Sequence, residues 1–370
     1  LHKHRRRQRQ MCIRDRVESV AFSPDGTRLS AGCGTITKAW EIKVWELEKG
    51  TELHTLRGHT NIVTSVAFSP DGAQLASASY DRTVKLWDTA TGSELRTLVG
   101  HPAMVHSVMF SPDGMQLASS GGDDSPTNPG EIKLWDLRTG LEERTLVGHS
   151  AKVSKVVFSP DGTQLASAGL DSTLKLWDTA TGDEVRTLSG HDFGVLSVAF
   201  SPDGIRLASG GADYAVKVWN VKKKAGFHLL EGHSHVVTSA AFNSQGTKLA
   251  SGSADKTIRV WDAETGAKLR TLTGQTQPVL CVAFSPDGKW LASGSGDARL
   301  EQPGDIRVFD TRSGDELHTL KGHSGGVASV VFSPYGTRLA SCSGDGSTRL
   351  WDAATGGAIR SFKVDKGKIL

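Results

Sequence analysis

Two short patterns recur along this chain at a nearly fixed interval, and their recurrence constrains the fold more than any other feature. The first is Gly-His or a variant of it, and the second is Trp-Asp or a variant. Successive members of each pattern lie 42 or 48 residues apart. A period near 42 residues indicates an array whose units are too small to bury an apolar face alone and must pack on their neighbours. The first pattern stands at Gly58, Gly100, Gly148, Gly190, Gly232, Gly274 and Gly322, and the second at Trp45, Trp87, Trp135, Trp177, Trp219, Trp261, Phe309 and Trp351.

Within one unit the apolar residues have the spacing of short strands. In the second unit, Val66 and Phe68 alternate with smaller or polar residues, and so do Val84 and Leu86. The segment Ser-Pro-Asp-Gly at 69–72 favours a tight turn, because proline presets its own φ and glycine tolerates a positive φ. No segment has the apolar spacing of a long amphipathic helix. The sequence therefore predicts four short strands per unit, paired in one small antiparallel sheet.

These units resemble the highly regular repeats of bacterial members of the WD40 (WD-repeat) family, over residues 17 to 363. The resemblance implies an all-β fold, a single β-propeller of eight four-stranded antiparallel blades around a central channel. A seven-bladed ring with one extra repeat is the alternative. The expected propeller covers 17–364 and is followed by a tail at 365–370. The expected blades are 17–57, 58–99, 100–147, 148–189, 190–231, 232–273, 274–321 and 322–364. Each can supply its own four strands, so we expect blades one and eight to close the ring by packing alone.

The resemblance also implies a buried network in each blade, in which a histidine, a serine, an aspartate and the tryptophan are joined by hydrogen bonds. In the seventh blade Gln275 and Phe309 replace the histidine and the tryptophan, and phenylalanine has no N–H to donate, so the network cannot be complete there. Six blades have all four residue types at the matching positions. They are His59, Ser77, Asp81 and Trp87; His101, Ser119, Asp123 and Trp135; His149, Ser167, Asp171 and Trp177; His191, Ser209, Asp213 and Trp219; His233, Ser251, Asp255 and Trp261; and His323, Ser341, Asp345 and Trp351.

Serine, histidine and aspartate together are also the residues of a hydrolase triad. An active site, however, is one accessible constellation with an oxyanion hole, whereas this set recurs in six blades and is expected to be buried. We therefore predict a structural role for the set and no enzymatic activity. The residue pattern gives no reason to expect a cofactor or a metal site.

Three blades have extra residues between the expected second and third strands, at 32–41, 121–131 and 296–305. Family geometry places this loop on the same face as the Gly-His loop, which is called the top face. In a ring of eight, the third and seventh blades stand opposite one another, so their longer loops are expected to flank the mouth of the channel.

Five large side chains are expected near the top face of blades two to five. They are Tyr80, Met104, Leu170, Phe193 and Tyr214. Aromatic residues are common anchors of protein interfaces, so we predict that this arc binds a protein or peptide partner. The predicted function is a non-catalytic scaffold for protein interaction, and a related hypothesis makes the chain the regulatory part of a longer protein.

The alternative function is that of an enzyme or a binder of small ligands that uses the central channel. Five residues near the first strands are expected to face the channel. They are Glu18, Thr64, His106, Ser154 and Thr238.

The positive net charge comes from the first sixteen residues, which contain seven Lys or Arg and one acidic residue. The remaining chain has 36 basic and 39 acidic residues, a net charge of −3, which gives no electrostatic case for binding nucleic acid. The segment 1–16 ends abruptly in mid-repeat and resembles translated sequencing adapter. We interpret it as non-native or as a disordered basic tail; a targeting peptide is a further alternative, but the segment lacks an apolar face.

No run of apolar residues is long enough to span a bilayer, so we expect no membrane association. The cysteines Cys12, Cys33, Cys281 and Cys342 form no Cys-x-x-Cys pair, which favours a reducing compartment. We expect a cytoplasmic location, and a monomer or a subunit of a heteromeric assembly.

Overall fold

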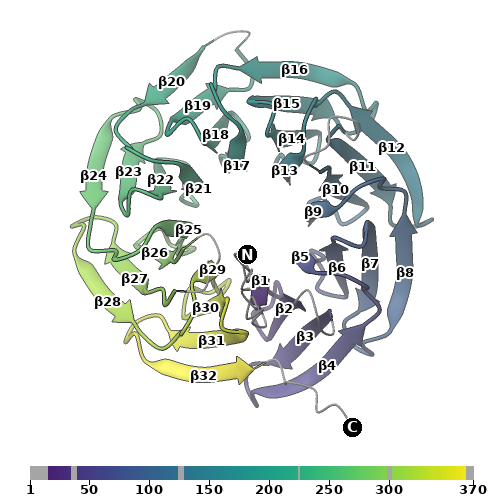
Figure 1. The fold of residues 1–370 in the computed structure, drawn as a ribbon, viewed down its shortest axis with the longest axis horizontal. Coiled ribbons are helices and arrows are strands. Elements are labelled where there is room, and N and C mark those ends of the chain that lie inside the picture. Colours follow the sequence, from purple (N-terminus) through teal and green to yellow (C-terminus); the bar gives the residue numbers. More distant parts are fainter. Residues whose placement is uncertain (1–15, 35–39, 124–128, 224–225, 298–301, 364–370) are drawn as a thin grey trace, which may run out of the picture.

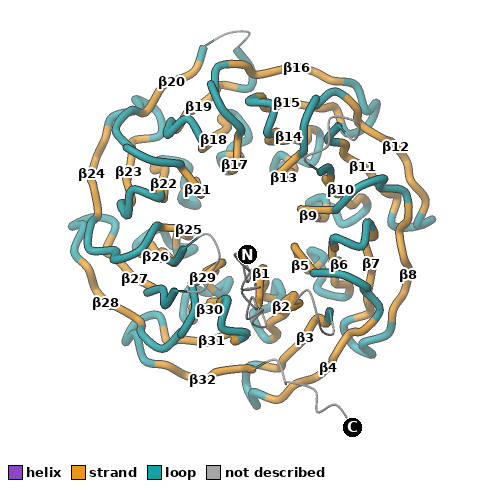
Figure 2. The backbone as a smooth tube through the Cα atoms, viewed as in Figure 1, coloured by secondary structure: helices purple, strands orange, loops and turns teal. Residues whose placement is uncertain are grey.

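The computed structural model describes residues 16–34, 40–123, 129–223, 226–297 and 302–363. In this part of the chain, eight four-stranded sheets surround a central channel (Figure 1). The described residues form strands and loops and no helix (Figure 2). The prediction of an all-β propeller with eight antiparallel blades is confirmed, and the seven-bladed alternative is wrong.

Each blade consists of four strands that are consecutive in the chain. The strands of blades one to four are β1 (Arg16–Phe22), β2 (Arg28–Gly34), β3 (Glu41–Glu46), β4 (Thr51–Arg57); β5 (Val63–Phe68), β6 (Gln74–Ser79), β7 (Thr83–Asp88), β8 (Glu94–Val99); β9 (Val105–Phe110), β10 (Gln116–Gly121), β11 (Glu131–Asp136), β12 (Leu141–Val147); and β13 (Val153–Phe158), β14 (Gln164–Gly169), β15 (Thr173–Asp178), β16 (Glu184–Ser189). The strands of blades five to eight are β17 (Val195–Phe200), β18 (Arg206–Gly211), β19 (Val216–Asn220), β20 (Phe227–Leu230); β21 (Val237–Phe242), β22 (Lys248–Ser253), β23 (Ile258–Asp262), β24 (Lys268–Leu272); β25 (Val279–Phe284), β26 (Trp290–Ser295), β27 (Ile306–Asp310), β28 (Glu316–Leu320); and β29 (Val327–Phe332), β30 (Arg338–Ser343), β31 (Ser347–Asp352), β32 (Ala358–Lys363).

The first strand of every blade lines the channel and the fourth lies on the outer rim (Figure 1). Neighbouring strands pair antiparallel, and in blade two Val66 stands opposite Ser77 and Leu75 opposite Trp87. The Ser-Pro-Asp-Gly turn joins the first two strands as predicted. There, Asp71 accepts the N–H of Ala73 at 2.9 Å, and Gly72 has a φ of 70°.

The core lies between the blades rather than within them. One cluster joins Leu86 and Leu98 of blade two to Val105, Leu117 and Trp135 of blade three. Similar clusters join the other neighbouring blades. Because each blade buries its apolar side chains against the next, a single blade has no complete core.

Blades eight and one close the ring without exchanging a strand, as expected. Strand β1 packs against β29 and β30. Across this joint the ring of Trp45 stacks on that of Phe362, with centroids 4.8 Å apart, and both side chains belong to one buried cluster. Arg360 Nη1 also donates a hydrogen bond to the carbonyl of Lys49 at 2.8 Å. Packing and this hydrogen bond stand in for the chain connection that every other joint has.

Candidate functional site

Two kinds of loop share one face of the disc. In blade two the N–H of Tyr80, which follows β6, donates to the carbonyl of Ile62, which precedes β5, at 2.9 Å. In blade four the N–H of Leu170 donates in the same way to the carbonyl of Lys152. In blades two to eight, the loop before the first strand therefore lies beside the residue that follows the second strand, and this face is the top face.

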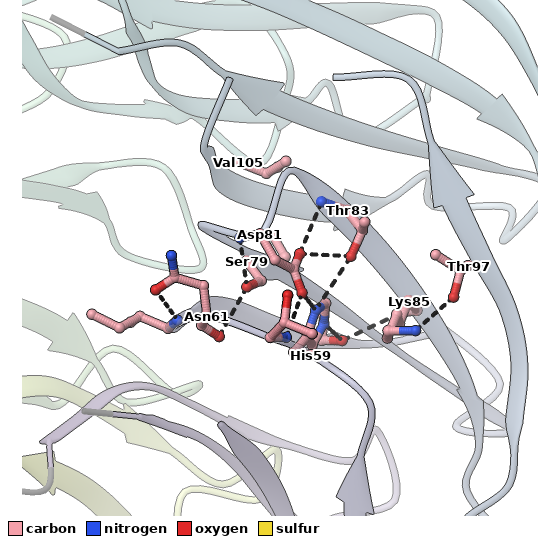
Figure 3. Close-up of polar contacts among 12 residues, drawn as sticks. His59, Asn61, Ser79, Asp81, Thr83, Lys85, Thr97 and Val105 are labelled. Carbon is pink, nitrogen blue, oxygen red and sulfur yellow. Dashed lines mark hydrogen bonds and ion pairs between the residues drawn. The ribbon is translucent and has the colours of Figure 1, made fainter. Parts of the chain in front are cut away.

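The histidine, serine, aspartate and tryptophan of blade two are joined as the resemblance implied. Figure 3 shows His59 and Asp81 of this network. The Nδ1 of His59 lies 2.7 Å from the Asp81 carboxylate, and its Nε2 lies 2.8 Å from Ser77 Oγ. Trp87 Nε1 donates to the same hydroxyl at 2.9 Å. Thr83 also donates to Asp81 (Figure 3). The network ties a top-face loop to the second and third strands.

The same network is present in four other blades, where every one of these distances lies between 2.7 and 3.0 Å. The histidines and serines are buried. The four sets are His149, Ser167, Asp171 and Trp177; His191, Ser209, Asp213 and Trp219; His233, Ser251, Asp255 and Trp261; and His323, Ser341, Asp345 and Trp351.

Burial and hydrogen bonding act on the pKa values in the network. Burial alone would raise the pKa of Asp171, but the hydrogen bond and the charge of His149, with bonds from Thr173 and the backbone, lower it to about 2. Burial lowers the pKa of His233 below 6.5, and Asp255 only partly offsets this effect. The low pKa of Asp171 holds it as a carboxylate, and the lowered pKa of His233 favours its neutral form.

Blade three departs from the predicted set. The Nε2 of His101 contacts Ser119 Oγ at 2.7 Å as expected. The carboxylate 3.2 Å from His101 Nδ1, however, belongs to Glu131 and not to the predicted Asp123. The loop between β10 and β11 is longer here, so its first residues no longer form the tight turn that places Asp81 in blade two. The first residue of β11 supplies the carboxylate instead.

The sequence contains a signal for this exchange. In the three blades with longer loops, an acidic residue stands at or just before the start of the third strand. Glu41 begins β3, Glu131 begins β11, and Asp305 directly precedes β27. Blades two and four have Thr83 and Thr173 at this position.

Blade seven keeps half of the network. Gln275 Nε2 donates to Ser293 Oγ at 2.6 Å and so replaces the Nε2 of histidine. Phe309 fills the tryptophan site and is 2% exposed. The complete network is absent as expected, but glutamine maintains the bond between the loop and the second strand.

A second set of polar contacts was missed altogether. The third strands of blades one to four each have a buried lysine two residues before the tryptophan. In blade two, Lys85 Nζ lies 2.9 Å from Glu94 and 2.6 Å from Thr97 Oγ1, both on the outer strand. Corresponding contacts join Lys43, Lys133 and Lys175 to Glu52, Glu142 and Glu184. The recurring Glu-x-x-Thr of the fourth strand was the available signal.

The five predicted partner-binding residues differ in exposure. Met104, Phe193 and Tyr214 are 40%, 63% and 45% exposed, whereas Tyr80 and Leu170 are half-buried. Two of them make ring contacts with the next blade. Tyr80 meets His106 edge-on at 5.3 Å, and Tyr214 stacks on His235 at 5.4 Å.

A pocket of about 350 Å³ brings part of this arc together with the channel residues. It is lined by Tyr80 and Leu170 of the arc, and by four of the five predicted channel residues, Glu18, Thr64, His106 and Ser154. Met104, Phe193, Tyr214 and Thr238 are not among its lining residues. Ile62, Lys152 and Leu196, which were not predicted, complete the lining. The pocket thus lies where the top-face loops of blades two to four meet the inner strands.

The longer loops lie between β2 and β3, β10 and β11, and β26 and β27, as expected. Blades three and seven stand across the channel from one another (Figure 1). Most of the three insertions (35–39, 124–128 and 298–301), residues 1–15 and the tail from 364 lie outside the described residues. The hypotheses about flanking loops and about segment 1–16 therefore stay predictions, except that Arg16 already belongs to β1.

The described ranges contain neither a metal-binding cluster nor a membrane-spanning helix. No cluster of three or more His, Cys, Asp or Glu there could hold a metal ion. No helix among these residues has the length and apolarity to cross a membrane.

Comparison with known proteins agrees with this architecture. No curated protein sequence matches the chain. A solved structure, that of the computationally designed protein Ika8, is similar with a TM-score of 0.77 and 30% identity, over 92% of this chain and 96% of that one. Because 1805 chains of solved structures match, such likeness singles out no function. The family profile "WD domain, G-beta repeat" (WD40) matches residues 9–46, 50–88, 92–136, 140–178, 182–220, 226–262, 266–300 and 314–352. The chain therefore belongs to the WD40 family.

Proposed function

We propose that this protein is a non-catalytic scaffold that holds a protein or peptide partner on the top face of blades two to five. The observation that supports this most strongly is the pocket at the channel mouth. There, side chains from several blades converge. Met104 and Phe193 are exposed outside the pocket, in the top-face loops before β9 of blade three and before β17 of blade five. WD40 propellers generally mediate protein interactions, so the family favours the same conclusion.

The chemistry of the pocket suits a peptide. Ile62, Leu170 and Tyr80 offer apolar surface, while Lys152 and Glu18 supply charges of both signs. Backbone hydrogen bonds hold the loops that bear Tyr80 and Leu170 in place before any partner arrives. Pre-organised loops lose less conformational entropy on binding, which favours affinity.

The alternative of a channel enzyme has less support. The Ser-His-Asp sets are buried within the blades and serve the tryptophan. Two channel hydroxyls, those of Thr64 and Ser154, donate to carbonyls of the next blade, Val105 and Val195, both at 2.8 Å. A hydroxyl whose proton is engaged with a carbonyl is poorly placed to act as a nucleophile. We therefore favour a structural role for these side chains.

The class of partner follows from charge and composition. The chain from residue 17 has a net charge of −3, which favours a protein partner over nucleic acid. The sequence has no Cys-x-x-Cys pair, which supports a cytoplasmic location. There the protein would act as a monomer or as a subunit of a heteromeric assembly.

The test is an affinity pull-down from the source cell with the full chain and two double variants. Tyr80→Ala with Phe193→Ala removes two rings from the top face. Leu53→Ala with Leu317→Ala removes two exposed side chains from outer strands and is the control. We expect a specific protein to be retained by the wild type and the control and lost by the top-face variant, with equal thermal stability of all three. Retention of the same protein by the top-face variant would place its binding site elsewhere.

A further inference from the structure

The outer strand of blade five differs from the other seven outer strands. Strand β20 has the sequence Phe-His-Leu-Leu and contains no Lys, Arg, Asp or Glu, whereas every other fourth strand contains at least one. Charged residues on an edge strand discourage other chains from pairing with it. Blade five lacks this protection.

The loss of charge follows from a coupled set of replacements. At the positions of Glu94 and Thr97 in blade two, blade five has Gly226 and Leu229. Its buried lysine, Lys217, instead lies 4.9 Å from the centre of the Phe227 ring and near Asp213, at 3.6 Å. Phe227 pairs directly with Trp219 and leaves no register shift between β19 and β20, unlike the other third and fourth strands. The result is a regular, uncharged edge.

This edge is open to the outside of the disc. Strand β20 ends the sheet order β17-β18-β19-β20 and lies on the outer rim (Figure 1). Phe227 and Leu229, two residues apart and so on the same side of the strand, are 38% and 46% exposed.

The joint to blade six is also open. At six of the eight joints, an arginine or histidine of the outer strand donates to a carbonyl in a turn of the next blade, as Arg144 does to Ala180. His228 occupies this position in β20, and among the described residues it makes no such bond. Instead a pocket of about 580 Å³ opens, lined by Lys223, His228, Phe227 and, from blade six, Glu264.

The loop before the edge is basic, on an otherwise acidic body. Lys222 and Lys223 lie in the loop before β20 and are exposed, and neither ammonium has a salt-bridge partner in the described part of the chain. An extended segment with acidic residues at one end would match both this charge and the unprotected edge.

We infer that the edge of blade five is a second binding surface, which takes up an extended, acid-flanked segment of another protein as a fifth strand beside β20. The main chain of β20 provides the hydrogen bonds, Phe227 and Leu229 contact alternate side chains of the added strand, and the lysines attract its acidic end. This surface lies on the rim and is independent of the top-face arc.

The experiment uses the full chain and a labelled nine-residue peptide in which four glutamates precede five alternating valines and threonines. Binding is measured by fluorescence anisotropy, and the location by hydrogen exchange of the β20 amides. We expect saturable binding that slows exchange at 227–230. Leu229→Glu should weaken binding by about tenfold, because it places a like charge beside the peptide, whereas Leu269→Glu, at a similarly exposed site on blade six, should change it less than about twofold.

Two further peptides separate strand addition from simple attraction. A version with N-methylated valines cannot form the main-chain ladder, and a version with lysines for glutamates reverses the charge; both should bind at least about tenfold more weakly. The top-face variant Tyr80→Ala with Phe193→Ala should bind the probe as the wild type does. Absence of binding, equal binding of the N-methylated peptide, or equal effects of the two glutamate substitutions would overturn the inference.

Discussion

At the scale of single residues, the ring and the N–H of Trp177 contribute separately to stability. The indole is 1% exposed, and its Nε1 donates to Ser167 Oγ at 2.9 Å. Trp177→Phe introduces the residue type that blade seven has at this position, Phe309. It should lower the free energy of unfolding by about 1–2 kcal/mol, since it removes one buried hydrogen bond. Trp177→Ala should cost about 3–5 kcal/mol, because it also leaves a cavity. Urea unfolding measures both, and equal stability of wild type and Trp177→Ala would contradict the structural role of the network.

Acid should weaken the fold through the same network, and the sign follows from the pKa directions. Burial lowers the pKa of His233 below 6.5, so the unfolded chain binds more protons and stability falls as the pH drops below about 6.5. A second loss of stability should begin as the pH drops below about 4. The pKa of Asp255 is about 2 in the folded state, so its carboxyl group is protonated in the unfolded chain before it is protonated in the folded one.

The variant His233→Gln tests the first of these two effects. Gln275 shows that glutamine can make the bond to serine at this position. The variant should therefore fold, and its melting temperature should fall less steeply than that of the wild type between pH 6.5 and 5. Parallel curves would show that this histidine does not contribute to the acid sensitivity.

Spacing and residue type predicted most of the network, but not the pairing that depends on loop length. The fixed period places His59, Ser77 and Trp87 at the same points of each blade, so one alignment predicts five blades correctly. Glu131 could not be chosen in this way, because the distance along the chain to His101 differs from that of Asp81 to His59. Only the structure shows which carboxylate lies beside the imidazole of His101.

At the scale of strands, the contacts between third and fourth strands should respond asymmetrically to mutation. Lys85 is buried, at 8% exposure, whereas Glu94 is partly open to water. Glu94→Ala leaves a buried ammonium without its carboxylate and should cost about 2–3 kcal/mol, but Lys85→Met leaves a carboxylate that water can solvate and should cost about 1 kcal/mol or less. Chemical unfolding of the two variants checks this order, and a larger loss for Lys85→Met would refute it.

The strands themselves were predictable because local signals agree. Ser-Pro-Asp-Gly turns and two-residue alternation mark the first two strands of most blades, and Val66 and Leu75 lie in strands as expected. Strand β20 was expected only as one more fourth strand. The structure shows why this strand can lack the glutamate: Lys217 contacts the ring of Phe227 instead.

At the scale of the whole molecule, the joint between blades eight and one should open first. It is the one joint that the chain does not cross, and it depends on the cluster around Trp45 and Phe362 and on the bond from Arg360. We expect amides of β1 and β32 to exchange faster than those of β14 and β18 in native-state hydrogen exchange. Arg360→Ala should widen this difference. Uniform protection around the ring would contradict a weaker joint between blades eight and one.

We propose that the top face of blades two to five holds a protein partner, and two exposed aromatic residues allow this to be tested. Phe193 on that face and Tyr335, in the turn between β29 and β30 on the opposite face, are both exposed aromatic residues, at 63% and 76%. The most direct measurement replaces each in turn with a photo-crosslinking phenylalanine analogue in the source cell. We predict a specific crosslinked protein from position 193 and none from position 335. Crosslinking from position 335 alone would contradict the claim.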